Sequence, residues 1–309
     1  MKCSTALGMI LFLTCSNNLF SQQLPLNSGY IFNMFQINPA YAGFRDALQI
    51  TSMFRKQWTG IQSSPQTAYF GVDMPIPNKR AGLGFQFVEE RQEISKALGA
   101  QLSYSYKIPT GESSSLSLGL QAGVFDYRID YTKVDVIDPN DPMFSQDISQ
   151  SKLNFGGGFF YSAPRFYIGL ASSNFIRNNP ISTETGNANS VTQNIQAYLN
   201  TGYIFTLSDN LLFKPSVLVR AVQGRAVSMD VNANLSVTDQ VSIGVSYRQK
   251  SALVGMINLK ILPDVHLGYA YDYNTTQFNN IVRGFHEVML RYQIPLLNKQ
   301  FQSPTKIFN

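Results

Sequence analysis

The chain has 309 residues, of which 44% are hydrophobic, 13% aromatic and only 14% charged, whereas an ordinary soluble domain carries roughly 25% charged residues. So few charges exclude an intrinsically disordered protein. A helical membrane protein is also excluded, because no stretch approaches the roughly 18 consecutive apolar residues that a transmembrane helix needs. The formal net charge is +5, but the basic residues are scattered and form no stripe of the kind that marks a nucleic-acid site.

Residues 1–21 have the parts of a secretory signal peptide: one basic residue, a short apolar stretch and a small residue, Ser21, before a polar start. We expect cleavage after Ser21 and export from the cytoplasm. A buried N-terminal helix and lipidation of Cys15 are less favoured alternatives. Both cysteines, Cys3 and Cys15, lie in this segment, so the mature protein is expected to have no disulfide and no thiolate metal ligand.

Alternation of apolar and polar residues dominates the chain from residue 47 to residue 294. It is clearest over 227–237, where the odd positions from Val227 to Val237 are apolar and the even positions from Ser228 to Ser236 are polar. This period of two predicts strands with one apolar and one polar face. We expect about fourteen of them, at 47–58, 66–75, 82–91, 96–107, 114–130, 151–163, 165–175, 192–206, 210–222, 226–238, 240–250, 252–262, 265–274 and 284–294.

The segments that connect these strands alternate in length. Short connectors fall at 75–81, 108–113, 164, 207–209, 239 and 263–264, and the long ones at 59–65, 131–150, 176–191 and 275–283. Two connectors on the long side, near Gly224 and Ser251, are short. Outer-membrane barrels have short periplasmic turns and longer extracellular loops, and strands of about this length. Globular strands are shorter, typically about five or six residues.

The sequence therefore predicts an all-β protein, a transmembrane antiparallel β-barrel over 47–294, followed by a periplasmic tail at 295–309. Closure into a barrel pairs every strand edge, which lipid requires, and the polar face would line the lumen. Tyrosines near strand ends would form interfacial girdles: Tyr104, Tyr106, Tyr203, Tyr271 and Tyr273. An arginine at Val231 is expected to cost about 2–4 kcal/mol near the midplane, and Asn232→Ser is expected to be nearly silent. A soluble two-sheet sandwich is the alternative.

Few residues of the mature chain could support chemistry, and we predict no catalytic, cofactor or metal-binding residue. His266 and His286 lie in predicted strands without a second ligand at metal spacing. The glycines at 156–158 favour a close backbone approach over a phosphate site, since no helix follows. The loop 135–142 gathers oxygen ligands that could hold Ca²⁺, but a solvated loop is favoured. The charged residues at 89–96 indicate a strand tip outside the membrane.

Several motifs resemble those of the PorP/SprF family. They are Asn38-Pro39-Ala40-Tyr41-Ala42-Gly43, Arg55-Lys56-Gln57-Trp58 with Pro65-Gln66-Thr67, the glycine-rich segment 154–161, the segment 166–170, and Gly284-Phe285-His286-Glu287-Val288-Met289-Leu290. The resemblance covers essentially the whole mature chain. It marks nine residues as candidates for a structural or docking role: Asn38, Pro39, Tyr41, Gly43, Arg55, Gln57, Trp58, His286 and Glu287.

This resemblance implies an outer-membrane barrel of Bacteroidetes that takes part in type IX secretion and gliding motility. It implies three partners: a secreted surface protein with a type B C-terminal domain, periplasmic ring components, and a peptidoglycan-binding lipoprotein. The expected function is non-enzymatic, to anchor the surface protein and couple it to the secretion apparatus. A passive porin or a transporter of hydrophobic ligands is the second hypothesis, and a lipid-active enzyme the third.

The segment 22–46 precedes the first predicted strand and contains the Asn38–Gly43 motif. Asn-Pro and small residues indicate a tight turn packed close to backbone, with Tyr41 as an aromatic anchor. Such a segment would be structural as a plug in the lumen, and functional as a periplasmic docking patch. We favour the plug, because turns are the commoner use of these residues.

Overall fold

The computed structural model describes residues 27–58, 63–77, 79–131, 147–175, 194–276 and 284–296. The expected signal peptide at 1–21 lies outside the described residues. So do the candidate calcium loop at 135–142 and residues 297–309 of the C-terminal tail. No helix in the described ranges is long and apolar enough to cross a membrane.

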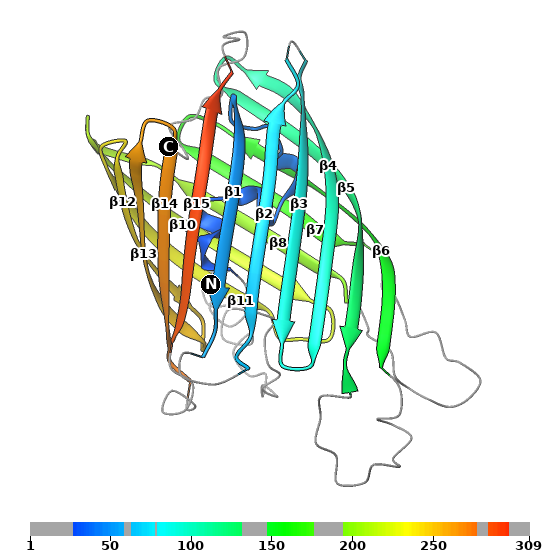
Figure 1. The fold of residues 1–309 in the computed structure, drawn as a ribbon. Coiled ribbons are helices and arrows are strands. Elements are labelled where there is room, and N and C mark those ends of the chain that lie inside the picture. The colour runs from blue at the N-terminus through cyan, green and yellow to red at the C-terminus, as the bar shows by residue number, and fades with distance from the viewer. Residues whose placement is uncertain are drawn as a thin grey trace, which may run out of the picture.

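The described strands form one closed antiparallel sheet (Figure 1). The strands are β1 (Ala47–Lys56), β2 (Gln66–Pro75), β3 (Ala81–Gln92), β4 (Ser95–Gly111), β5 (Ser114–Ile129), β6 (Ile148–Ser162), β7 (Phe166–Asn174), β8 (Gln196–Tyr203), β9 (Phe205–Ser208), β10 (Leu211–Val222), β11 (Ser228–Val237), β12 (Val241–Arg248), β13 (Ala252–Leu262), β14 (Val265–Asn274) and β15 (Phe285–Pro295). Sequential strands pair, and β1 pairs with β15, which closes the ring. β8 and β9 both pair with β10, so they are two parts of one interrupted strand. The fifteen labels thus correspond to fourteen strands around the barrel, and the predicted fourteen-stranded barrel is confirmed.

The two faces of the sheet follow the predicted alternation. On β11, Ser228, Asp230 and Asn232 are at most 4% exposed, whereas Val231 is 43% exposed. The exposed side chains of the other strands are also mainly large and apolar, among them Leu102, Leu120 and Val245. The outer face is therefore suited to lipid and the inner face carries the polar groups.

Two features differ from the alternation pattern. Ile204 lies between β8 and β9; its side chain is buried in an apolar cluster of the lumen, and its N–H donates to the carbonyl oxygen of Arg165. On β13, the inward residues Ala252, Val254 and Met256 are apolar instead of polar. Both exceptions arise where the barrel wall packs against apolar groups inside the lumen.

Those groups belong to residues 27–46, here called the lumen segment, which lies inside the ring of strands in dark blue (Figure 1). It contains three short 3₁₀ turns, η2 (Ser28–Ile31), η3 (Met34–Gln36) and η4 (Pro39–Tyr41). Most of its residues are buried. The described part of the 22–46 segment thus packs in the lumen and forms no patch outside the barrel.

The barrel has two distinct ends. The strands β2 and β3, β4 and β5, β6 and β7, β9 and β10, β11 and β12, and β13 and β14 meet at one end of the barrel, called the turn end, before and after the connectors 76–80, 112–113, 163–165, 209–210, 238–240 and 263–264. The strand ends before and after the connectors 57–65, 130–147, 175–195 and 275–284 lie at the other end, called the loop end. Three further connectors at the loop end, 93–94, 223–227 and 249–251, are short. In outer-membrane barrels the shorter turns face the periplasm, so the turn end is the periplasmic end.

Candidate functional site

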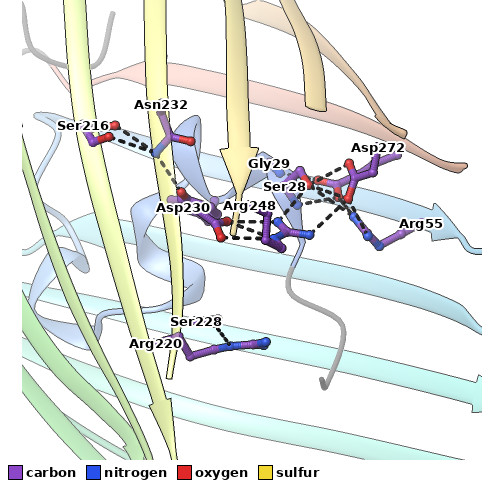
Figure 2. Close-up of polar contacts among 12 residues, drawn as sticks. Ser28, Gly29, Arg55, Ser216, Arg220, Ser228, Asp230, Asn232, Arg248 and Asp272 are labelled. Atoms are coloured by element: carbon purple, nitrogen blue, oxygen red, sulfur yellow. Dashed lines mark hydrogen bonds and ion pairs between the residues drawn. The ribbon is translucent and has the colours of Figure 1, made fainter. Parts of the chain in front are cut away.

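A group of buried charges lies inside the barrel near the loop end (Figure 2). This loop-end cluster consists of Arg55, Asp230, Arg248, Asp272 and Glu287, contributed by β1, β11, β12, β14 and β15. The Arg55 guanidinium contacts Asp272 at 2.8 Å and Glu287 at 3.0 Å. Arg248 contacts Asp230 at 3.1 Å and Asp272 at 3.2 Å. Asp272 therefore links two arginines, and the cluster spans five strands as one network.

The loop-end cluster holds the first residues of the lumen segment. The backbone N–H groups of Ser28 and Gly29 donate to the two carboxylate oxygens of Glu287 at 2.8 and 2.6 Å. The Ser28 hydroxyl donates to Asp272 at 2.8 Å. A carboxylate that accepts N–H groups at the start of a helical turn satisfies donors that have no partner within the turn. Glu287 and Asp272 thus bind the wall to the lumen segment as well as to Arg55.

The Asn38–Gly43 motif forms the second attachment of the lumen segment. Asn38 caps η4 by accepting the Ala40 N–H at 2.9 Å, and its side-chain amide donates to the Phe159 carbonyl of β6 at 3.0 Å. Pro39 stands at the first position of η4, where its fixed φ is compatible with a helical turn. The turn lies directly against Gly119 of β5, where a Cβ would overlap the backbone of Pro39 and Ala40. Only a glycine at this point of the wall allows so close an approach.

Gly43 ends the motif and directs the chain into β1. Its φ is +61°, a left-handed conformation that glycine adopts without strain. Its N–H donates to the carboxylate of Asp73 on β2 at 2.9 Å. The motif is therefore fixed to β2, β5 and β6, and it positions the chain to enter the sheet at the turn end.

A buried aromatic cluster also joins the lumen segment to the inner wall. Tyr41 stacks on Phe44 with ring centroids 4.9 Å apart, and both rings meet the edge of Phe160 from β6, at 5.4 and 5.1 Å. Further members come from the lumen segment and from the inward faces of β7, β8 and β10: Tyr30, Met34, Phe35, Tyr167, Tyr198 and Leu218. Each buried aromatic ring removes roughly 150–250 Å² from water. The lumen is thus packed like a protein core at this level.

Six of the nine candidate residues belong to the two attachments of the lumen segment, and three lie elsewhere. Asn38, Pro39, Tyr41 and Gly43 lie in the turn described above, while Arg55 and Glu287 face each other across β1 and β15. Gln57 is 7% exposed, and its N–H donates to the Pro65 carbonyl at 2.9 Å at the base of a loop. Trp58 follows with φ +51°. His286 points to the outer face, where its Nδ1 lies 2.7 Å from the Tyr269 hydroxyl. Neither of these contacts of Gln57 and His286 involves the lumen segment.

Sequence reasoning did not single out Asp230, Arg248 and Asp272. All three occupy positions that alternation assigns to the lumen, and all are at most 5% exposed. A charged residue on the inward face of a strand, close to its loop-end limit, was the available signal. Their pairing depends on strand register, which no single strand reveals.

The other residues considered in the sequence analysis lie in the wall of the barrel or at a strand tip. Gly158 faces inward, and a Cβ there would lie 2.6 Å from the Asn38 side-chain oxygen, which is the close approach that was favoured over a phosphate site. His266 faces the lumen and is 7% exposed. Within the described residues no three or more His, Cys, Asp or Glu side chains are grouped to hold a metal ion. Arg91 and Lys96 pair with Glu89 at the exposed tip of β3 and β4.

A depression of about 650 Å³ lies on the outer face of the barrel. It extends across β2 to β6, and its lining includes Leu83, Phe85, Leu102, Leu120 and Phe155. Since these side chains face lipid, the depression belongs to the membrane-contacting surface.

Comparison with solved structures finds other outer-membrane barrels. The CymD monoaromatic hydrocarbon channel aligns with a TM-score of 0.55 and 11% identity, covering 90% of this chain and 95% of that one. A FadL homologue of Pseudomonas aeruginosa gives 0.48 and 13%, covering 88% and 95%. Omp33 of Acinetobacter baumannii gives 0.47 and 10%, covering 82% and 100%. At such identities the CymD likeness shows the fold alone.

Comparison with curated proteins gives no match. The family described as "Type IX secretion system membrane protein PorP/SprF" matches residues 19–292, which include the lumen segment and nearly the whole barrel. Because the match extends over most of the sequence, the resemblance noted in its motifs is confirmed, and with the barrel fold it assigns the protein to the outer membrane. The chain belongs to the PorP/SprF family of type IX secretion system membrane proteins.

Proposed function

We propose that this protein is a non-enzymatic, closed outer-membrane barrel that anchors a secreted surface protein and couples it to the type IX secretion apparatus. Its partners are a surface protein with a type B C-terminal domain at the loop end, and periplasmic ring components or a peptidoglycan-binding lipoprotein at the turn end. Membership of a secretion family supports a role in a multi-protein assembly.

The observation that carries the proposal is the filled lumen. Residues 27–46 occupy it with an aromatic cluster, and they are fixed to the wall near the loop end by Glu287 and near the turn end by Asp73. A passive pore needs an open water-filled passage. A barrel whose own chain packs the passage is better suited to present its two end surfaces to partners.

The test of anchoring is deletion of this protein in its own bacterium. We expect its partner, the secreted surface protein with a type B C-terminal domain, to be lost from the cell surface, while proteins exported through other barrels of the system stay at their normal level. Expression of the full chain should restore the surface protein. Unchanged amounts of surface protein in the deletion strain would rule out the anchoring function.

Conductance separates the anchor from a porin. The purified full barrel, inserted in a planar bilayer, is expected to show no steady ion current. Steady porin-like conductance of the intact chain would favour the passive pore.

A transporter of hydrophobic ligands is the second candidate, and the apolar depression on the outer face is the observation that favours it. A conduit of this kind predicts that deletion slows uptake of an apolar small molecule such as a monoaromatic hydrocarbon. The anchoring proposal predicts unchanged uptake, so measuring uptake in the deletion strain distinguishes the two.

A further inference from the structure

Three basic residues, here called the cation row, lie side by side on the outer face at the loop end of β3, β4 and β5. Arg91 is directly opposite Lys96 in the sheet, and Lys96 is directly opposite Arg128. Glu93 lies farther out, in the exposed turn between β3 and β4. Side chains directly opposite each other are about 5 Å apart, and like charges in such pairs are destabilising. An anion bound across the cation row would remove this repulsion.

The carboxylates beside the cation row are less accessible than the cations. Glu89 pairs with Arg91 and Lys96, and Asp126 pairs with Arg128. The three basic side chains are 62%, 38% and 63% exposed, whereas the two carboxylates are 21% and 22% exposed. Both arginines contact their carboxylates through Nε, and the terminal nitrogens of a guanidinium carry further N–H donors. Since exposed ion pairs are weak, these contacts leave the row able to bind a second anion.

The cation row marks the outer limit of the apolar surface. On β4 the outward residues are apolar or aromatic from Leu98 to Ile108, a stretch of the length that a tilted strand needs to cross the hydrocarbon core. Lys96 is the next outward residue toward the loop end, where β3 and β4 join (Figure 1). The row therefore lies at the level where the headgroups of the outer leaflet begin.

The apolar depression lies on the same strands, deeper in the membrane. Its lining includes four cross-strand neighbours on β3 to β6: Phe85, Leu102, Ala122 and Phe155. The short side chain of Ala122 stands between the larger Leu102 and Phe155, which hollows the surface at this point. The volume of about 650 Å³ falls in the range of about 300–1,000 Å³ that is usual for ligand pockets.

The distance between the cation row and the depression corresponds to one leaflet. Lys96 and Leu102 are six residues apart on β4, which is about 20 Å along the strand. At a strand tilt of about 45° this separation is about 14 Å in depth, and half of the hydrocarbon core is about 15 Å. An acyl chain whose headgroup lies at the cation row therefore extends into the depression.

We propose that this part of the outer face binds one lipid of the outer leaflet, with a phosphate-bearing headgroup on the cation row and an acyl chain in the depression. Guanidinium groups bind phosphate through paired N–H donors, and an ammonium group adds a point charge. The headgroup offsets the repulsion within the row, and the chain covers the apolar hollow. The site is separate from the anchoring role, because it depends only on outward residues of β3 to β6.

The test uses the full barrel purified in detergent and freed of lipid, with diphosphorylated lipid A as the probe. Native mass spectrometry is expected to show one lipid A retained per chain, and lipid A without its phosphates should bind at least about tenfold more weakly. The double variant Lys96→Met/Arg128→Met should weaken binding by about tenfold or more, since it removes two charge-assisted contacts. Lys56→Met, which removes an exposed outward charge at the loop end of β1, should bind lipid A as the unmodified chain does.

The depression is tested by a change that leaves the charge unaltered. Ala122→Phe narrows it and should weaken lipid A binding severalfold, whereas Val245→Phe, at an exposed outward position of β12, should leave binding unchanged. Each variant is first checked for the gel-mobility shift of a folded barrel. Equal binding of the two forms of lipid A would overturn the proposal, as would unchanged affinity in the cation variant or in Ala122→Phe. Displacement of lipid A by an equal concentration of inorganic phosphate would also overturn it, because the acyl chain would then contribute nothing.

Discussion

Arg55 holds together the two carboxylates that bind the start of the lumen segment. It pairs with Asp272 and Glu287, and both carboxylates also bind Ser28. A buried ion pair stabilises little relative to apolar residues of the same volume, because both charges lose their hydration. Removing only one partner of the pair is costly, however, because the other charge is left buried and uncompensated. The network therefore specifies one position of the lumen segment more than it adds net stability.

Replacement of Arg55 by methionine is expected to lower the free energy of unfolding by about 3–5 kcal/mol, since it leaves Asp272 and Glu287 without one of their counter-charges. The measurement is urea titration of the folded fraction, followed by the shift in gel mobility that unheated barrels show. Lys56→Met is the matched control, because the neighbouring side chain is exposed on the outer face. Equal midpoints for the two variants would contradict the role assigned to Arg55.

Asn232 requires a correction to the expectation from alternation. Its side-chain amide donates to the Tyr30 hydroxyl of the lumen segment at 3.0 Å and to Ser216 at 3.2 Å, and it is 2% exposed. These contacts change the expectation: Asn232→Ser is expected to be destabilising. We expect a loss of about 1 kcal/mol, the usual net value of a buried hydrogen bond, in the same urea titration. Tyr30→Phe in the Asn232→Ser background should add little, whereas a fully additive loss would argue against their contact.

Val231, the next residue on β11, tests the outer face. Val231→Arg should lower the free energy of unfolding in a bilayer by about 2–4 kcal/mol, because it places a charge in the lipid. The same change at Val227 should lower it by only about 0–1 kcal/mol, because that residue lies at the loop-end limit of the strand. Both valines are exposed, at 43% and 58%. Folding titrations in lipid vesicles measure both values. Equal costs at the two positions would contradict the placement of Val231 near the membrane midplane and of Val227 near the membrane surface.

At the scale of the elements, strands are predictable from sequence where the lumen is polar. Residues 227–237 alternate without exception because one face meets lipid and the other meets hydrogen-bonding groups. β13 departs from the pattern, since Ala252, Val254 and Met256 face the apolar part of the lumen segment. A strand with two apolar faces in an otherwise alternating barrel therefore indicates that something apolar fills the lumen.

The loop-end cluster was only partly predictable, for a physical reason. Alternation places Arg55, Asp230 and Asp272 inside the barrel, but their contacts join residues far apart in sequence, and the tilt and register of the strands decide which charges meet. The family motifs marked Arg55 and Glu287 without giving their relation. The pairing of these charges follows from the register of neighbouring strands, which the sequence of a single strand does not reveal.

Gly119 gives a prediction for the contact between η4 and the wall. Gly119→Val should displace the turn at Pro39 and Ala40, because the added side chain has no space, and overpacking of this kind costs about 1–3 kcal/mol. The loss of folded fraction in urea measures it. Gly255→Val is the matched control, since nothing lies within 4 Å of a Cβ at that position. If both variants lost stability equally, strand propensity and not contact with η4 would explain the effect.

At the scale of the whole molecule, the contacts at the two ends of the lumen segment fix the direction in which it runs through the barrel. Ser28 is bound at the loop end by Glu287 and Asp272, whereas Phe44 lies beside Lys107 and Asp46 precedes β1 at the turn end. The segment thus runs the length of the lumen, from the outer end toward the periplasmic end, before the first strand begins. The first described residue is consequently close to the face that carries the long loops.

This direction can be tested with an inserted epitope. An epitope placed directly ahead of Asn27 is expected to bind antibody on intact cells, because the chain at Ser28 is held near the outer end of the barrel. The same epitope in the turn at Asp239, at the opposite end, should bind antibody only after the outer membrane has been permeabilised. Both chains should retain the gel-mobility shift of a folded barrel. Antibody binding at Asp239 but not ahead of Asn27 on intact cells would reverse the assigned ends, and protection of both positions would mean that the segment does not reach the outer face.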